Sequence, residues 1–92
     1  MKLVILQDSN GNWKNYYYSD MEELRRTISR IENGTLIGWN VTIGDEVQIG
    51  CNCTIQDNLV IGNRAIIDTN FNVDTNVSDD EVFYTPSKWE RD

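Results

Sequence analysis

Residues 31–78 read IENGTL IGWNVT IGDEVQ IGCNCT IQDNLV IGNRAI IDTNFN VDTNVS, which are eight six-residue units in unbroken succession. The first position of each unit is isoleucine or, in the last unit, valine. The fifth position holds Thr35, Val41, Val47, Cys53, Leu59, Ala65, Phe71 and Val77. Self-similarity at a fixed period is the signature of a solenoid, and a six-residue period indicates a parallel β-helix.

Three units would make one triangular coil of about 18 residues, in which first- and fifth-position side chains point inward. The expected stacks are Ile37 on Ile55 on Val73, Ile43 on Ile61, and Ile31 on Ile49 on Ile67. β-Branched side chains suit such a packed, pleated surface. Glycine recurs at the second position (38, 44, 50 and 62) and asparagine at the fourth (40, 52, 58, 70 and 76). Glycine suits a corner with little room, and asparagine suits a left-handed backbone conformation.

This pattern resembles the hexapeptide-repeat superfamily over residues 31–78. The resemblance implies a left-handed parallel β-helix and commonly a homotrimer. Most members of that superfamily are acyltransferases that use acyl-coenzyme A or acyl carrier protein. A smaller branch resembles γ-class carbonic anhydrase and holds zinc with three histidines between subunits, and other members are scaffolding subunits without chemistry.

The sequence argues against enzymatic activity of either kind. It contains no histidine, whereas the acyltransferases use histidine as a general base and the anhydrases use histidine as a zinc ligand. We therefore expect no catalytic residue, no metal site and no cofactor. The carboxylates that could replace the base are Asp45, Glu46, Asp57, Asp68 and Asp74. Acidic residues at outward positions are ordinarily solvated surface groups.

The segment before the repeats is expected to cap the solenoid. Residues 2–7 and 12–18 form a predicted β-hairpin, because Asn10-Gly11 is a strong hairpin signal. A helix should start at Ser19, which together with Glu22 fits a capping box, and should end at Asn33-Gly34. Its apolar face comprises Met21, Leu24, Ile28 and Ile31.

The predicted fold is therefore mainly β: a short left-handed parallel β-helix capped by an N-terminal hairpin and one α-helix. We divide the chain into the cap (residues 1–30), the repeats (31–78, about 2.7 coils at 18 residues per coil) and an acidic tail (79–92). In the tail, residues 82–84 could form a strand beside the N-terminal hairpin, and Thr85-Pro86 could start a short helix containing Trp89.

The distribution of charge along the sequence indicates which kinds of partner molecule the protein could bind. The net charge is −7, and residues 1–36 contribute nothing to it because they carry five acidic and five basic residues. The acidic repeats and tail argue against direct nucleic-acid binding, which needs a basic surface. An acidic surface could instead compete for a nucleic-acid-binding protein, or simply keep an oligomer soluble.

Cysteine usage and hydropathy suggest a cytoplasmic protein. Cys51 is expected to face outward and Cys53 inward, so the two thiols should not pair, and free thiols suit a reducing compartment. Two cysteines without histidine do not make a zinc site. The apolar run at residues 3–6 is too short for a signal peptide, and no stretch is long enough to span a membrane.

Two groups of residues are candidates for binding. Aromatic side chains in the cap could stack on a nucleotide-like ligand held between subunits, with arginines nearby for its phosphates: Trp13, Tyr16, Tyr17, Tyr18, Arg26 and Arg30. Aromatic clusters in a small cap also commonly form the core. Apolar residues at outward positions of the repeats are candidates for the trimer interface: Leu36, Trp39, Val60 and Ile66.

The sequence thus favours a non-catalytic oligomeric binding protein. It would inhibit a protein partner or sequester a small ligand, and in size and charge it is of the same type as the small anti-defence inhibitors of phages and mobile elements. The alternatives are a scaffold or assembly subunit and a divergent acyltransferase.

Overall fold

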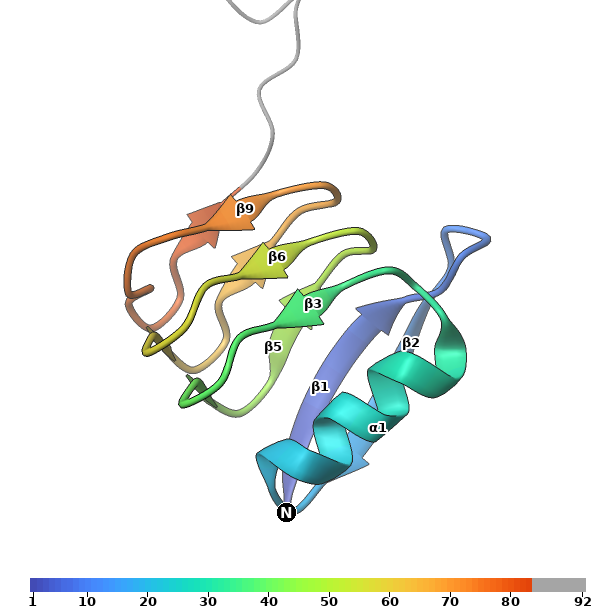
Figure 1. The fold of residues 1–92 in the computed structure, drawn as a ribbon, viewed down its shortest axis with the longest axis horizontal. Helices are drawn as coiled ribbons and strands as arrows, with labels where there is room; N and C mark the ends of the chain where they lie inside the picture. The colour runs from blue at the N-terminus through green and yellow to red at the C-terminus, as the bar shows by residue number, and fades with distance from the viewer. Residues whose placement is uncertain (84–92) are drawn as a thin grey trace, which may run out of the picture.

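The computed structural model of the chain describes residues 1–83, in which ten short strands and one helix form a mainly β structure (Figure 1). The cap contains β1 (Lys2–Gln7), β2 (Trp13–Tyr18) and α1 (Met21–Ile31). The repeats contain β3 (Leu36–Ile37), β4 (Thr42–Ile43), β5 (Val47–Ile49), β6 (Thr54–Ile55), β7 (Val60–Ile61), β8 (Ile66–Ile67) and β9 (Asn72–Val73), followed by β10 (Val82–Phe83). Within residues 1–83, no helix is long and apolar enough to cross a membrane.

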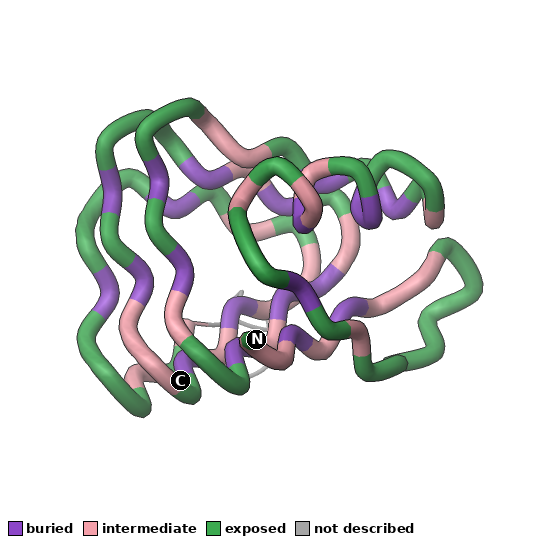
Figure 2. The backbone as a smooth tube through the Cα atoms, turned by 90° about the horizontal axis from the view of Figure 1, so that it is seen from below, coloured by how far each residue is buried: buried purple, intermediate pink, exposed green. Residues whose placement is uncertain are grey.

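The repeats build three parallel sheets with a register of 18 residues. Leu36 pairs with Thr54, Thr42 with Val60, and Gln48 with Ile66, each in a different sheet. Each six-residue unit therefore carries the chain to the next sheet, and three units return it to the first. Figure 2 shows buried segments alternating with exposed corners along these coils.

Inward packing of the first and fifth positions is confirmed. The first-position residues Ile43, Ile49, Ile55, Ile61, Ile67 and Val73 are at most 1% exposed. At the fifth position, Val47, Cys53 and Ala65 are fully buried, and Thr35 is buried with its hydroxyl donating to the carbonyl of Gly50. Burying these side chains in one column supplies the main stabilisation of the coils.

The corners explain the polar positions of the repeat. Asn40, Asn52, Asn58 and Asn70 all have positive φ, as the sequence predicts. The same position is left-handed when it is occupied by Glu46 or Arg64, so the corner geometry overrides residue preference there.

Glycine at the second position is required by the next coil. A Cβ atom on Gly44 would lie 2.8 Å from the backbone nitrogen of Asn63, and one on Gly50 would lie 2.6 Å from that of Thr69. Gln56 occupies the same second position in its own unit, although it is not a glycine. The residue that would face it, Thr75, lies in a segment where the coil is shortened.

That shortening makes the expected register of the last unit wrong. Val77 bridges Ile61 and Val82 pairs with Ile66, at separations of 16 residues where the earlier coils have 18. Val77 therefore occupies a first position and not a fifth. Asn76 has no positive φ, and the left-handed residue that follows, Asp80, lies at the next corner, where it stacks on Arg64. The shortening falls in the polar stretch Asp74-Thr75-Asn76, whose side chains are not part of the core. The hydrophobic pattern of the sequence therefore does not reveal that two residues are missing from this coil.

The cap joins the coils through β1, which pairs in parallel with β5. Leu6 lies beside Ile49, so Leu6 fills the place that we expected for Ile31, which instead belongs to α1. One end of β1 is held by the backbone of Leu3, which donates to Asp45 at 2.8 Å and accepts from Glu46 at 2.7 Å. At the other end, the carbonyl of Gln7 accepts from Asn33 at 2.9 Å.

The hairpin β1–β2 is confirmed with its predicted turn, although the turn differs in detail. Only Gly11 has a positive φ, and the Asp8 carboxylate accepts from the backbone of Asn10 and Asn12 at 2.9 Å each. The pattern fits a three-residue turn that ends in a left-handed glycine, and not a two-residue Asn-Gly turn.

The helix begins one residue later than predicted. Asp20 is the N-cap and accepts from the backbone of Glu23, whose carboxylate in turn accepts from the backbone of Ser19. The expected box of Ser19 and Glu22 is therefore wrong by one residue, because β2 extends to the buried Tyr18 and leaves Ser19 as a connector. Glu32, with φ of 54°, ends the helix.

The strand expected in the tail exists as β10, but it lies away from the hairpin. The five-stranded sheet has the order β10-β8-β5-β1-β2, so β10 and the hairpin are at opposite edges. β10 continues the coils because its register follows β8. Tyr84, Thr85-Pro86 and Trp89 lie outside the described residues.

Replacement of Gly44 by alanine should destabilise the protein by about 1–3 kcal/mol, because the new methyl group would collide with the backbone of the next coil. Urea denaturation monitored by circular dichroism measures the change. Gln56→Ala is the matched control at the same repeat position and should change the stability by only about 0.5 kcal/mol. Equal effects of the two substitutions would contradict the close-approach argument.

Candidate functional site

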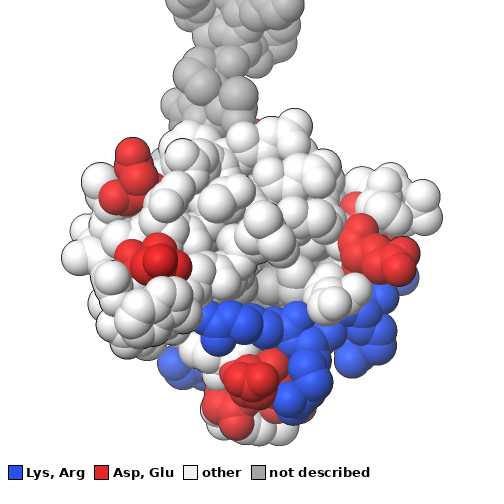
Figure 3. Space-filling model, viewed as in Figure 1, with Lys and Arg blue, Asp and Glu red and all other residues white. Residues whose placement is uncertain are grey.

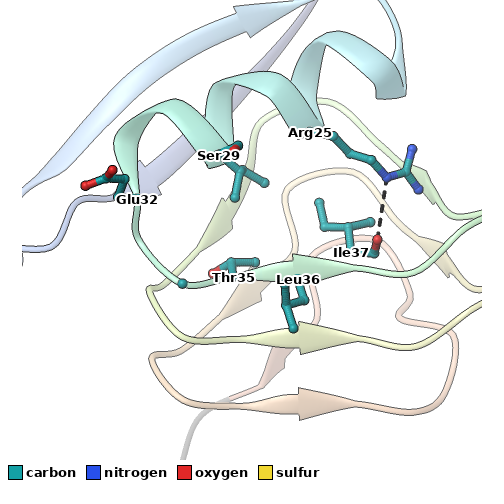
Figure 4. Close-up of a pocket in the computed structure, with 8 residues that line it drawn as sticks. Arg25, Ser29, Glu32, Thr35, Leu36 and Ile37 are labelled. Carbon is teal, nitrogen blue, oxygen red and sulfur yellow. Dashed lines mark hydrogen bonds between the residues drawn. The ribbon is translucent and has the colours of Figure 1, made fainter.

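A groove of about 370 Å³ separates α1 from β3 at the N-terminal end of the coils (Figure 4). We call it the α1–β3 groove. It is lined by residues of the helix, of the segment that connects it to the coils, and of β3: Arg25, Ile28, Ser29, Glu32, Gly34, Thr35, Leu36 and Ile37. This volume lies in the range of ordinary ligand pockets.

One stripe of α1 forms a wall of the groove. Arg25, Ile28, Ser29 and Glu32 are spaced three or four residues apart, so they share one side of the helix. Leu24 and Ile28 are buried, which anchors the helix over the core. Seven residues separate Arg25 from Glu32, which corresponds to about 10.5 Å along the helix axis. Figure 4 shows these two charged side chains at opposite ends of the groove.

The other wall is the edge of β3. The Arg25 side chain donates from Nε to the carbonyl of Ile37 at 3.5 Å and also bonds the carbonyl of Gly38. Thr35 is held by its backbone N–H, which donates to the Asn33 side chain at 3.0 Å. Leu36 points away from α1 and is 67% exposed. The groove therefore combines a strand edge, the apolar residues Ile28 and Ile37, and one charge of each sign.

The groove lies in the basic part of an acidic protein. Figure 3 shows Lys and Arg side chains gathered over α1 and its border with the coils. Arg25, Arg26 and Arg30 belong to this helix. Of the other basic residues among 1–83, Arg64 is paired with Asp80 at 2.7 Å and Lys14 lies 3.8 Å from Asp8.

The aromatic residues proposed for a nucleotide-like ligand do not lie together. Side chains alternate along β2, so Tyr16 and Tyr18 face the core with α1, whereas Trp13 and Tyr17 lie on the opposite face. The exposed Arg26 is on α1 and thus on the other side of the hairpin from Trp13 and Tyr17. Exposed Arg30 is on α1 as well, so the predicted stacking site with nearby arginines is not formed within one chain.

Tyr18 has a structural role. It is 2% exposed, and its hydroxyl lies 2.9 Å from the carbonyl oxygens of both Ile43 and Gly44. Burial, with a smaller contribution from the negative charge of Asp45, raises the pKa of Tyr18 to about 12.

The four candidate interface residues also lie apart. Leu36, Val60 and Ile66 belong to three different sheets, and Trp39 lies at the corner between β3 and β4. Residues of different coils stack on the same side only when they are 18 or 36 residues apart, and no two of these four residues have that spacing. Leu36, Trp39 and Val60 are all more than half exposed, so each remains available for separate contacts.

Several carboxylates that could have served as a base support the fold. Asp57 accepts from the backbone of Trp39 at 3.0 Å, and Asp45 accepts from that of Leu3. Cys51 is partly exposed and Cys53 is buried, and both thiols are free, as the sequence predicts. No group of three or more Cys, Asp or Glu residues within 1–83 is arranged to hold a metal ion.

No family model, no curated protein and no solved structure matches the chain. Arg25, Ser29 and Glu32 were not singled out as site residues from the sequence. Their helical spacing was visible, but the open edge of β3 opposite them depends on how the cap joins the coils.

The role of Tyr18 predicts a specific alkaline instability. The folded protein favours the neutral phenol, so this contribution to stability is complete below pH 10 and is lost as the pH rises through about 12. Tyr18→Phe should lose this pH dependence. At pH 7 it should cost about 1–3 kcal/mol, because the carbonyl of Gly44 loses its side-chain donor.

Chemical denaturation at pH 7 and between pH 10 and 12 measures both effects. Tyr17→Phe is the matched control, because Tyr17 is 59% exposed on the opposite face, and it should behave like the wild type. If Tyr18→Phe kept the same loss of stability between pH 10 and 12, another group would be responsible for it.

Proposed function

We propose that this protein is a non-catalytic binding protein that engages a protein partner through the α1–β3 groove and thereby inhibits it. The observation that carries the proposal is the groove itself, where Ile28 and Ser29 of α1 face the edge of β3 between Arg25 and Glu32. Apolar surface supplies affinity, and charges at the two ends supply orientation.

The repeats would serve as a rigid scaffold. The 18-residue register, the three parallel sheets and the left-handed corner residues support a left-handed parallel β-helix of the hexapeptide-repeat type. Sites supported by packed secondary structure hold their geometry better than sites on loops. Such a scaffold would present the groove with little loss of conformational entropy on binding.

The residues present favour binding over chemistry. The sequence has no histidine to act as general base, and Asp45 and Asp57 are engaged in corner hydrogen bonds. The groove offers Arg25, Glu32 and Ser29, which can orient a partner. A serine nucleophile would need a hydrogen-bonded base, and among residues 1–83 no hydrogen bond joins the Ser29 hydroxyl to the Glu32 carboxylate in the groove.

Oligomerisation and location are separate parts of the proposal. A threefold homotrimer would join two different surfaces of each subunit, and the side that carries Leu36, Thr54 and Asn72 could supply one of them. Partly exposed Cys51 suits a reducing cytoplasm. Native mass spectrometry of the purified protein tests the trimer directly.

A tryptophan at Ser29 should abolish partner binding, because Ser29 is exposed and lines the groove. Asn15→Trp is the matched control, because Asn15 is an exposed residue on β2 that does not line the groove. We expect the wild type and Asn15→Trp to retain the same partner in affinity purification from host lysate, and Ser29→Trp to lose it. Undiminished retention by Ser29→Trp would refute the assignment of the groove as the binding site.

A further inference from the structure

At the edge of β3 that faces α1, two backbone groups have no hydrogen-bond partner among residues 1–83. Leu36 and Gly38 direct their N–H groups to the carbonyls of Cys53 and Ile55 on the β6 side. Because successive residues of a strand alternate in direction, the N–H of Ile37 and the carbonyl of Thr35 face the groove. Among residues 1–83, neither of these two groups takes part in a hydrogen bond.

These two groups have the spacing of one parallel strand pairing. In a parallel ladder, a residue donates to the carbonyl before its partner and accepts from the N–H after it. A residue opposite Leu36 would thus bond Thr35 and Ile37 together. The coils use the same pattern between β3 and β6, where the pairing is also parallel.

The neighbouring sheet shows what normally occupies such an edge. There, β1 lies beside β5 in parallel and forms the rung before the first coil. In the sheet that contains β3, the order ends at β3, and α1 lies in the corresponding place. A helix is about 10 Å wide and a strand needs only about 4.8 Å, so a helix at this end does not close onto the strand edge.

The size of the groove matches a short extended segment. The stripe from Arg25 to Glu32 is about 10.5 Å long, and an extended chain advances about 3.3 Å per residue, so about three residues fit. The groove volume of about 370 Å³ is consistent with a segment of that length.

The charges at the two ends of the groove favour the same parallel orientation of a bound strand as the free backbone groups do. Glu32 lies near Gly34, at the start of β3, and Arg25 bonds the carbonyl of Gly38, at its end. A strand parallel to β3 would bring its first residue to Glu32 and its last residue to Arg25. A basic residue followed two positions later by an acidic residue is therefore complementary to the groove.

We propose that the α1–β3 groove binds an extended segment of a partner protein, which adds as a strand parallel to β3 with a basic residue at Glu32 and an acidic residue at Arg25. This proposal rests on the proposed function and names its recognition mode, β-strand addition. Main-chain hydrogen bonds would give affinity, and the two end charges would set the direction.

Two capped peptides of equal composition test the proposal on the full chain by NMR titration. Acetyl-Thr-Lys-Val-Glu-Thr-amide should bind about fivefold more tightly than acetyl-Thr-Glu-Val-Lys-Thr-amide, in which the charges are reversed. Binding of the first peptide should slow the hydrogen exchange of the Ile37 amide by about tenfold, because a hydrogen bond protects it. Equal binding of the two peptides would overturn the proposed direction.

A charge-exchanged variant separates specific recognition from loss of folding. Arg25→Glu combined with Glu32→Arg should reverse the preference and bind the second peptide more tightly, and circular dichroism checks that it folds. Arg26→Glu is the matched control outside the groove, and it should leave the preference unchanged. An unchanged preference in the exchanged variant would refute the role of the two charges.

Three further outcomes keep this proposal distinct from the proposed function. Loss of the partner in Ser29→Trp without protection of the Ile37 amide by bound partner would retain the groove but refute strand addition. Retention of the partner by Ser29→Trp would refute the groove itself. If the Ile37 amide exchanges slowly in the full chain and rapidly after deletion of residues 84–92, the chain's own C-terminal segment is the occupant, and an external partner is overturned.

Discussion

The parallel pairing of β1 with β5 is the interaction on which the rest of the structure depends. It places Leu6 beside Ile49 and Val4 beside Val47, so that the apolar column of the coils continues into the cap. Short solenoids expose apolar ends that must be covered. Here a strand from the start of the chain covers one of the three sides, and it brings the attached helix over the remaining core. Hydrogen bonds at both ends of β1, through Leu3 and Gln7, fix that position.

The sequence predicts the repeating part of the fold well because its signal is periodic. Inward isoleucines, glycines at close approaches and left-handed asparagines each recur at a fixed spacing, and the structure confirms this pattern up to Asn70. The prediction was wrong where periodicity and local context compete. Ile31 satisfies both the helical and the six-residue pattern, and it belongs to the helix. The two-residue shortening before Val77 also leaves the hydrophobic pattern superficially intact.

The site residues were harder to predict because they depend on contacts between distant segments. Tyr18 belongs to the core because its strand lies against the corner at Gly44, 26 residues away. The three apolar residues at sixth positions, of which Leu36 and Val60 are exposed and Ile66 is half-buried, occupy different sides because their spacing is not a multiple of 18. The groove arises because a helix, which is wider than a strand, covers the end of a sheet at which a further strand could pair. Neither the mismatch nor the orientation of Arg25 toward Gly38 is encoded in a local motif.

The shortened coil bears on fibre formation. Strand edges at the ends of a solenoid can stack on further copies, and an uninterrupted ladder would offer an in-register template for growth. At this end the separation changes from 18 to 16 residues, so a second molecule with regular coils cannot match every side at once. Asp74 and Asp79 add negative charge at this end, which repels the same end of an identical copy, whereas Asp80 is paired with Arg64. The irregular last coil thus disfavours end-to-end stacking of further copies on this end of the repeats.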